Sequence, residues 1–157
     1  MAIHVALFEP AIPANTGNIA RTCAGTGVKL HLIKPLGFST EDKMLKRAGL
    51  DYWSHVDVSY HDGIYEMFDQ YPEAQFYFIT KFGKKPYTSF DYSDTSTDIF
   101  FVFGKETTGL PDEIIKENEE RCLRIPMNDH IRALNLSNTA AILVYEALRQ
   151  QSFPNLH

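Results

Sequence analysis

The sequence predicts an α/β domain in which a mostly parallel β-sheet is flanked by helices. Short apolar runs of strand length alternate along the chain with segments of helical periodicity, a pattern typical of parallel sheets connected by helices. Ile99–Phe103 is an uninterrupted apolar run, as expected of a strand buried on both faces. No internal repeat or linker divides the 157 residues, so a single domain over 1–157 is expected.

The first elements are a strand and a helix. Residues 4–8 are expected to form an apolar strand, and Pro13 lies in a turn that starts a helix running to about residue 24. Gly25 and Gly27 are expected to end this helix, because glycine readily leaves a helix through a left-handed turn.

The remaining elements continue the alternation. Thr40 is the expected N-cap of a helix that Gly49 closes, and Pro111 starts another short helix. Residues 81–97 form a long polar stretch with no assigned element. Strands are expected at 28–33, 56–60, 75–80, 99–103 and 122–125, and helices at 40–48, 63–70, 111–118 and 135–150.

The first helix has one apolar face, formed by Ile19, Ala20, Cys23 and Ala24. Arg21 lies roughly 200° round the helix from Ile19. It therefore points away from the core, toward solvent, a site or another subunit.

The last helix is apolar on more than one side, which predicts burial on more than one side. Two interpretations stay open: a fully buried central helix, or a helix whose second side is covered by another copy of the chain. The main stripe is Leu136, Ala140, Leu143, Val144, Ala147 and Leu148, and the further apolar residues are Ala141, Ile142 and Tyr145.

Composition places the chain among ordinary globular proteins, with 44% hydrophobic and 22% charged residues. No apolar run is long enough to span a bilayer and no basic segment precedes the first apolar run, so a cytoplasmic location and no membrane partner are expected. The two cysteines, Cys23 and Cys122, belong to no metal-binding pattern and are expected to be buried, reduced thiols.

A net charge of −5 argues against a general nucleic-acid coat but leaves room for a local basic patch. Each candidate cation also has an ordinary interpretation as a solvated surface charge. The candidates are Lys43, Lys46 and Arg47, then Lys81, Lys84 and Lys85, with Arg21 and Arg132 as single cations.

Two later segments are predicted to form ligand-binding loops after strands. FVFGKETTGLP runs from Phe101 to Pro111 and places Gly104, Glu106 and Gly109 after the buried strand, where ligands of open α/β sheets usually bind. RIPMNDHIRALNLSN begins at Arg124 and ends with three polar residues at a helix start, more than capping requires. A simple strand-to-helix turn remains the alternative for each.

The N-terminal segment EPAIPANTGNIAR is a third junction of this kind. It is not a dinucleotide fingerprint, because that motif needs G-x-G-x-x-G directly after a strand and only Gly17 occupies the turn.

Three motifs in this order resemble the SPOUT superfamily of RNA methyltransferases: PxNTGNIxR, FGxExxGLP and RIPM…LNLSNxxxxxxYE. Within it, the chain is similar to the small bacterial enzymes that methylate the 2′-O of the ribose at tRNA position 34, a cytidine or modified uridine. The similarity covers nearly the whole chain, including DKMLKRAGLDYW, with no appended RNA-binding domain.

The resemblance implies a C-terminal trefoil knot, which pattern alone could not predict because knots are very rare. It also implies a homodimer with a shared active site, and S-adenosyl-L-methionine as cofactor. Tyr145 matches a position on the dimerisation helix. The cofactor-binding positions are Thr80, Gly104, Ile125 and Ala133, and the active-site positions are Asn15, Arg21, Glu106 and Asn135.

Ala133 stands where relatives commonly have serine, a change that is harmless if this residue contributes only its backbone. Two proton-handling roles stay open. By analogy with the family, Arg21 is the general base. A guanidinium, however, has a pKa of about 12 or more and stays charged. Arg21 is therefore better suited to binding a phosphate or orienting the hydroxyl. Glu106 is the alternative acceptor, or orients Arg21 or the substrate.

The six histidines are scattered without ligand spacing, so no metal is expected. The expected RNA partner is a small, single-stranded target, the tRNA anticodon loop, where a nucleotide can be splayed out. Lys43, Lys46 and Arg47, with Arg21, are the cations expected to contact it. Two rival functions are a catalytically weak RNA-binding homologue and a methyltransferase for another RNA site.

Overall fold

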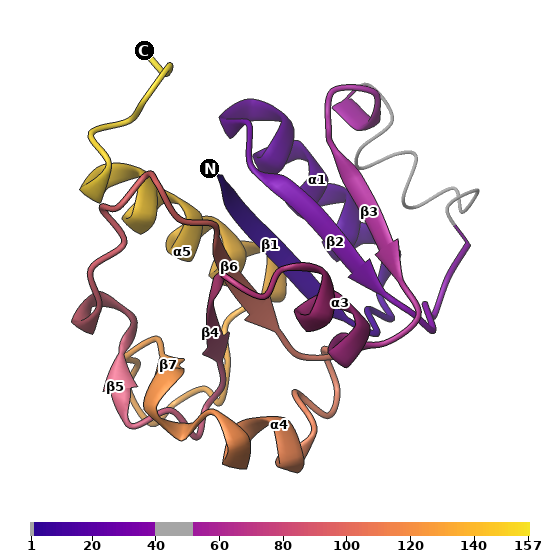
Figure 1. Cartoon of the computed structure of the whole chain (residues 1–157). Helices are drawn as coiled ribbons and strands as arrows, with labels where there is room; N and C mark the ends of the chain where they lie inside the picture. Colours follow the sequence, from indigo (N-terminus) through magenta and orange to yellow (C-terminus); the bar gives the residue numbers. More distant parts are fainter. Residues whose placement is uncertain (1, 40–51) are drawn as a thin grey trace.

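A computed structural model describes residues 2–39 and 52–157 and contains a parallel β-sheet (Figure 1). Within these residues the strand order is β3-β2-β1-β6-β4-β7-β5, and every pair of neighbours is parallel. The predicted α/β architecture is confirmed. The strands are β1 (Ile3–Phe8), β2 (Lys29–Ile33), β3 (Val58–His61), β4 (Gln75–Ile79), β5 (Lys85–Pro86), β6 (Ile99–Phe103) and β7 (Cys122–Arg124).

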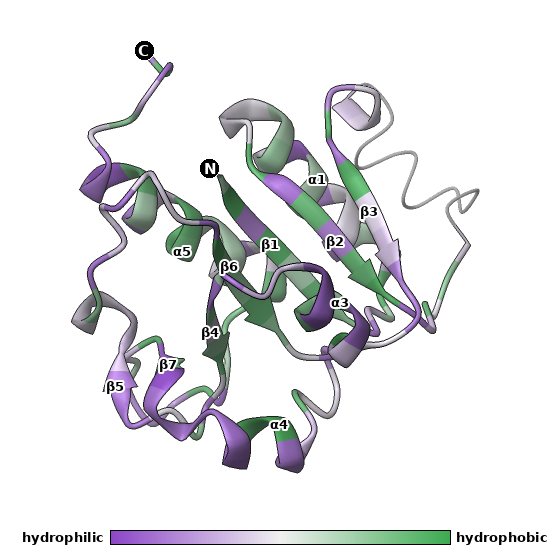
Figure 2. Cartoon of the chain, viewed as in Figure 1, coloured by the Kyte–Doolittle hydropathy of each residue, from purple (hydrophilic) through white to green (hydrophobic). Residues whose placement is uncertain are grey.

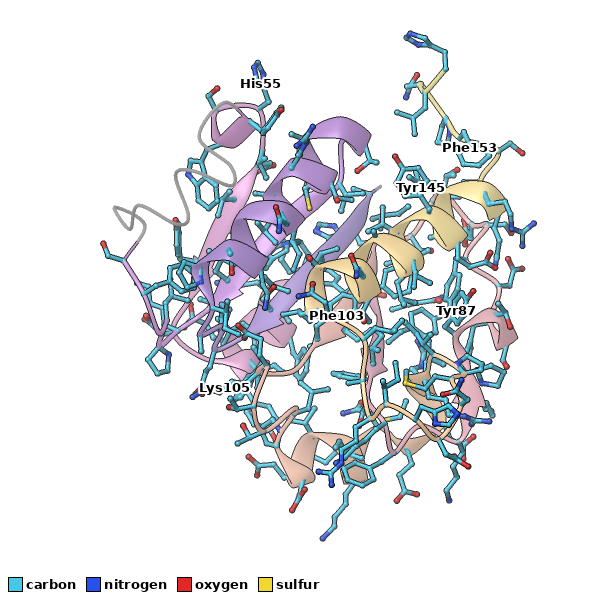
Figure 3. The ribbon with its side chains drawn as sticks, turned by 180° about the vertical axis from the view of Figure 1, so that it is seen from behind. His55, Tyr87, Phe103, Lys105, Tyr145 and Phe153 are labelled. Atoms are coloured by element: carbon cyan, nitrogen blue, oxygen red, sulfur yellow. The ribbon has the colours of Figure 1, made fainter. Side chains whose placement is uncertain are left out.

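Helices cover both faces of the sheet. Helices α1 (Pro13–Thr26) and α5 (Leu136–Gln150) pack against one face and come to the front when the molecule is seen from behind in Figure 3. Helices α3 (Ile64–Gln70) and α4 (Asp112–Glu117) cover the other face. Two 3₁₀ helices, η1 (Tyr87–Ser89) and η2 (Glu119–Arg121), precede β6 and β7 respectively.

Helix α1 begins and ends for local reasons. Pro13 occupies its first turn, where a missing N–H costs nothing. Gly27 has a φ of 77°, and its N–H donates to the Cys23 carbonyl at 2.9 Å, which closes the helix. The prediction that Gly25 helps to end the helix was wrong, because Gly25 lies inside the last turn.

The core is divided by the sheet into two apolar layers. Alternate residues of β6 enter opposite layers: Phe101 and Phe103 pack toward α1 and α5, whereas Phe100 and Val102 pack toward α3 and α4. All five β6 residues are buried, as predicted for this run. Figure 2 shows β6 as an apolar strand in the middle of the molecule.

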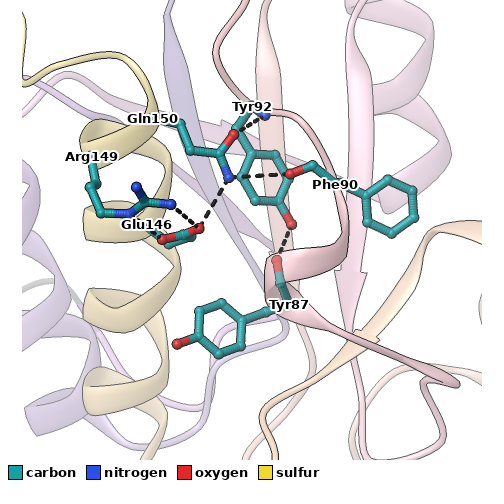
Figure 4. A network of polar contacts seen from close by, with 6 residues as sticks. All are labelled: Tyr87, Phe90, Tyr92, Glu146, Arg149 and Gln150. Atoms are coloured by element: carbon teal, nitrogen blue, oxygen red, sulfur yellow. Dashed lines mark hydrogen bonds and ion pairs between the residues drawn. The ribbon is translucent and has the colours of Figure 1, made fainter.

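The segment between β4 and β6 was predicted as a polar stretch, and this was wrong in part. It contains β5 and η1, and the Tyr92 ring is fully buried. Gln150 of α5 accepts a hydrogen bond from the Tyr92 N–H at 2.6 Å and donates to the Phe90 carbonyl at 3.2 Å (Figure 4). The Tyr92 hydroxyl donates to the Tyr87 carbonyl at 2.6 Å within the segment. The two bonds of Gln150 hold the segment against α5.

Helix α5 has the predicted stripe, and Ala140, Leu143, Val144, Ala147 and Leu148 are buried. Tyr145 is 50% exposed, so the interpretation of α5 as a fully buried helix is wrong for the single chain. The side of α5 that carries Tyr145 is open to another molecule.

The predicted helix 40–48 lies outside the described residues, and the knot stays a prediction. Both cysteines are buried, as predicted, and burial raises the pKa of the Cys23 thiol to about 12. No helix among the residues described is long and apolar enough to cross a membrane.

Three histidines that are far apart in the sequence form a buried chain across β1, β2 and β3. His4 Nδ1 lies 2.8 Å from His31 Nε2, and His31 Nδ1 lies 2.8 Å from His61 Nε2. At the other end, His4 Nε2 lies 3.1 Å from the Asp98 carboxylate. No sequence pattern indicates this chain, because only the parallel pairing of the three strands brings the histidines together.

The Asp98 carboxylate fixes the direction of every hydrogen bond in the chain. It also accepts from the Ala2 N–H at 2.9 Å, and a carboxylate needs donors, so His4 Nε2 carries a proton toward it. Nδ1 of neutral His4 then accepts from His31, and His31 in turn accepts from His61. His61 Nδ1 is left as a buried nitrogen without a partner among the described residues.

Candidate active site

A cavity of about 820 Å³ opens where β4, β6 and β7 end. The last residue of each strand lines it: Ile79, Phe103 and Arg124. This is the edge at which parallel α/β sheets usually bind ligands. Seven of the predicted site residues line the cavity, namely Asn15, Thr80, Gly104, Glu106, Ile125, Ala133 and Asn135.

The loop after β6 is a tight turn that carries Glu106 into the cavity. Lys105 and Gly109 bond to each other through both backbone N–H groups, at 3.2 and 2.8 Å, and Gly109 has a φ of 72°. A Cβ on Gly104 would lie 2.4 Å from both the Gly109 carbonyl carbon and the Leu110 nitrogen. Glycine at 104 is therefore required for the loop to close upon itself.

Gly104→Ala is expected to open this turn. Because the Cβ meets backbone rather than a flexible side chain, we expect a loss of about 1–3 kcal/mol in the free energy of unfolding and much weaker binding of S-adenosylmethionine. Urea unfolding and calorimetric titration measure the two effects. Gly63→Ala is the matched control, since its Cβ would meet nothing within 4 Å; equal behaviour of the two variants would refute this account of the turn.

The Glu106 carboxylate holds the chain that leads into α1. It accepts hydrogen bonds from the Ala11 N–H at 3.0 Å and from the Ile12 N–H at 2.5 Å. Hydrogen bonds to a charged acceptor are the stronger kind. The loop after β6 is thus joined to the loop after β1, and α1 begins one residue later.

Asn15 and Asn135 meet in the cavity wall although 120 residues separate them. Asn135 is the N-cap of α5, and its Oδ1 accepts from the Ser137 N–H at 2.9 Å. That bond leaves the Asn135 NH₂ group to donate to Asn15 Oδ1, at 3.1 Å. The cap therefore fixes the orientation of both amides.

The Asn15 NH₂ group is the unsatisfied group of this pair. Asn15 is only 6% exposed and lines the cavity, and its Nδ2 has no hydrogen-bond partner among residues 2–39 and 52–157. This nitrogen is not sealed from solvent, so it can bond to a molecule in the cavity. Its position in the cavity wall suits donation to an oxygen of a bound molecule.

Arg21 lies apart from the other predicted active-site residues. It is exposed on α1 and does not line the cavity, and its guanidinium lies 4.9 Å from the centre of the Tyr52 ring. The predicted outward direction of Arg21 is confirmed. Lys43, Lys46 and Arg47 lie outside the described residues.

Several cavity residues were not assigned to the site from sequence. Phe82, Met127 and Asp112 gave no signal, and Lys81 and Arg132 appeared only among the candidate cations. Four of these residues line the cavity because the loops after β4 and β7 meet there, whereas Asp112 reaches it from the start of α4. His130, in the loop after β7, is exposed.

Comparison with known proteins identifies the family of the chain. The sequence model of the SpoU rRNA methylase family matches residues 2–145. The chain belongs to this family. Family members named as tRNA (cytidine(34)-2′-O)-methyltransferases include a Methylovorus glucosotrophus protein, 45% identical over 150 residues that cover 95% of this chain and 96% of the relative. A Geobacillus stearothermophilus protein, provisionally assigned the same activity, is 69% identical over 156 residues and 99% of both chains.

Solved structures of SpoU-type proteins share the fold. A provisionally assigned RNA methyltransferase from Bacillus anthracis superposes with a TM-score of 0.94 at 62% identity, covering 99% of this chain and 98% of that one. A structure described as giving insight into the 2′-OH methylation of C/U34 on tRNA has a TM-score of 0.89 at 38% identity, covering 96% and 97%.

The cavity of this SpoU methylase fits S-adenosylmethionine. Its volume lies in the range of cofactor sites, which is about 300–1,000 Å³. Ile79, Phe103 and Ile125 give it an apolar wall suited to an adenine ring, and the close approach of backbone at Gly104 leaves no side chain in the way. Polar groups of Asn15, Glu106 and Asn135 stand beside this wall.

Proposed function

We propose that this protein transfers a methyl group from S-adenosylmethionine to the ribose 2′-oxygen of the wobble nucleotide, position 34, of tRNA. The proposal rests on the match to relatives named tRNA (cytidine(34)-2′-O)-methyltransferase, which covers nearly the whole of both chains. The joined Asn15 and Asn135 amides in a cavity of suitable size support it independently of names.

When bound, S-adenosylmethionine supplies a methyl group on an electrophilic sulfonium. Backbone groups at Thr80, Gly104, Ile125 and Ala133 hold it against the apolar wall. Ala133 contributes no side-chain hydroxyl, and a backbone role asks for none. The protein must then orient the ribose hydroxyl, which is where positioning lowers the barrier most.

Asn15 orients the substrate. Its free NH₂ donates to a ribose or phosphate oxygen, and Asn135 holds it in that orientation through the α5 cap. Glu106 is a positioning residue, because its oxygens already accept the Ala11 and Ile12 amides. This favours the orienting role for Glu106 over that of proton acceptor.

Arg21 acts from the partner subunit of a homodimer. It is exposed on α1, and Tyr145 is half exposed on α5, the helix that packs beside α1 (Figure 3). As a permanently charged guanidinium, Arg21 grips a phosphate or orients the hydroxyl. The 2′-OH proton passes to water in the open cavity late in the reaction, once the bond between oxygen and methyl group has begun to form.

A mixed dimer of Arg21→Ala and Asn15→Ala chains tests the shared site. One of its two sites combines an intact cavity with an intact Arg21, so we expect about half the wild-type rate from a dimer whose single-variant parents are nearly inactive. Heterodimers purified with two different tags give the measurement. A heterodimer as inactive as its parents would mean that Arg21 serves its own chain.

The substrate is the anticodon loop, contacted by Lys43, Lys46 and Arg47 together with Arg21. Residues 1–157 act as one cytoplasmic domain without a metal; among the described residues, no group of histidine, cysteine or acidic side chains is placed to hold one. The knot belongs to the C-terminal half of this domain.

Incorporation of labelled methyl groups into tRNA tests the function. The purified dimer is expected to label unmodified tRNA and to leave ribosomal RNA unlabelled. Binding of tRNA without transfer would favour the catalytically weak homologue, and labelling of ribosomal RNA alone would favour a methyltransferase for another site.

A further inference from the structure

The loop between β4 and β5 holds an aromatic ring at the cavity rim. The Phe82 N–H donates to Thr80 Oγ1 at 3.2 Å, and the Gly83 N–H donates to the Thr80 carbonyl at 3.1 Å. Arg124 donates to the Gly83 carbonyl at 3.2 Å. A Cβ on Gly83 would lie 2.5 Å from the Leu123 carbonyl carbon, so the loop is pressed directly onto β7. Phe82 is therefore positioned by backbone contacts on both sides.

The Phe82 side chain itself is 62% exposed, the largest exposed fraction among the large apolar residues described. It lines the cavity together with Ile79 and Phe103, which form the sheltered part of the wall, Phe103 being only 1% exposed. Phe82 stands at the open side, where a macromolecular substrate has to approach.

Two lysines without carboxylate partners lie next to Phe82 in the sequence, one before it and one two residues after it. Lys81 Nζ lies 5.2 Å from the Phe82 ring centre, and Lys84 is exposed. Neither forms an ion pair with any residue in the described ranges, whereas Lys85 lies 3.5 Å from Glu120. In a chain of net charge −5, an unneutralised pair beside an exposed ring is a local site for an anionic, aromatic partner.

We propose that Phe82 is a stacking platform for a base of the RNA substrate that flanks the target nucleotide, with Lys81 and Lys84 contacting the adjoining phosphates. The inference rests on the proposed function and adds to it a contact that fixes the register of the RNA. Single-stranded nucleic acids are bound in this way, through stacking on aromatic rings and cations along the backbone. A loop whose backbone is held on both sides suits the role because little backbone freedom is lost on binding.

The test uses an anticodon stem-loop with 2-aminopurine on either side of the target nucleotide. On binding to the wild-type dimer, fluorescence of one of the two probes is expected to be quenched by stacking. Phe82→Ala and Phe82→Leu are expected to abolish the quenching and to weaken RNA binding about tenfold, whereas Phe82→Trp keeps both. Lys81→Gln with Lys84→Gln is expected to reduce the dependence of binding on salt.

Tyr65→Ala is the matched control, because it removes an aromatic side chain of 46% exposure that does not line the cavity. It is expected to leave RNA binding unchanged. Unchanged RNA affinity in both Phe82→Ala and Phe82→Leu would overturn the inference. The inference would also be overturned if these variants bound S-adenosylmethionine as much more weakly as they bind RNA, or if their dimers dissociated. Phe82 would then serve the cofactor or the interface. A wild-type protein that methylates no tRNA would instead refute the proposed function.

Discussion

Replacing Glu106 by glutamine is expected to slow single-turnover methyl transfer by about 10- to 100-fold, because small misplacements of positioned groups carry penalties of this size. An amide offers one acceptor oxygen where the carboxylate offers two, and its NH₂ would face the N–H group of either Ala11 or Ile12. The chain before α1 is then released, and with it the orientation of Asn15.

The positioning role has a signature that a proton acceptor would lack. Amide hydrogen exchange at Ala11 and Ile12 is expected to accelerate in Glu106→Gln, and Glu106→Asp, with its shorter reach, is expected to be slow as well. Glu117→Gln is the control, because Glu117 accepts a hydrogen bond from Tyr65 and lies outside the cavity. Unchanged exchange together with a flattened pH–rate profile would identify Glu106 as the base instead. If neither Glu106→Gln nor Arg21→Lys slowed transfer, both assignments would be wrong.

The second large effect concerns stability below neutral pH. Burial, together with the neighbouring His4 and His61, lowers the pKa of His31 from 6.5 to about 3. Burial also lowers the pKa of His4 and of His61, despite the opposing effects of Asp98 on His4 and of Glu66 on His61. Between pH 6.5 and 3 the unfolded chain therefore binds a proton at His31 that the folded chain does not.

Because the unfolded state binds more protons in this window, stability falls as pH falls through it. The contribution of His31 to the free energy of unfolding is complete above pH 6.5. Below that pH it decreases by about 1.4 kcal/mol for each pH unit of acidification. Urea unfolding at fixed protein concentration is thus expected to show a loss of about 2–3 kcal/mol between pH 6.5 and 4.5 from His31 alone.

His31→Phe separates this effect from other titrations. It is expected to lower stability at pH 7, because His4 Nδ1 and His61 Nε2 lose their partners, and to flatten the profile between pH 6.5 and 4.5. His130→Gln, at an exposed site, is expected to keep the wild-type profile. A profile equally steep in His31→Phe would mean that the buried histidines do not control acid stability.

The fold was predictable because its signals are local. Apolar runs such as Ile99–Phe103 and the glycine at 27 act within a few residues, and the structure confirms the strand and the helix end that they predict. Tyr92 was missed because its burial depends on Gln150, 58 residues away, which satisfies its backbone. The histidine chain was missed for the same reason.

Seven of the predicted site residues lie along one cavity, but the bonds among them could not be predicted. The sequence pattern predicts Gly104 as a loop glycine and Asn135 as a helix cap, and the family resemblance assigns both to one active site. That Glu106 holds the amides of Ala11 and Ile12, 95 and 94 residues away, could not follow from spacing. The loop position of Phe82 likewise depends on contacts with β7 that only the folded chain brings about.

The central claim is methylation of the wobble ribose in tRNA. Nuclease digestion and mass spectrometry of tRNA treated with the enzyme and labelled S-adenosylmethionine test it most directly. The expected result is one added methyl group at nucleotide 34, on the ribose and not the base, lost in Asn15→Ala. A methyl group on a base, or on the ribose of another nucleotide, would contradict the account.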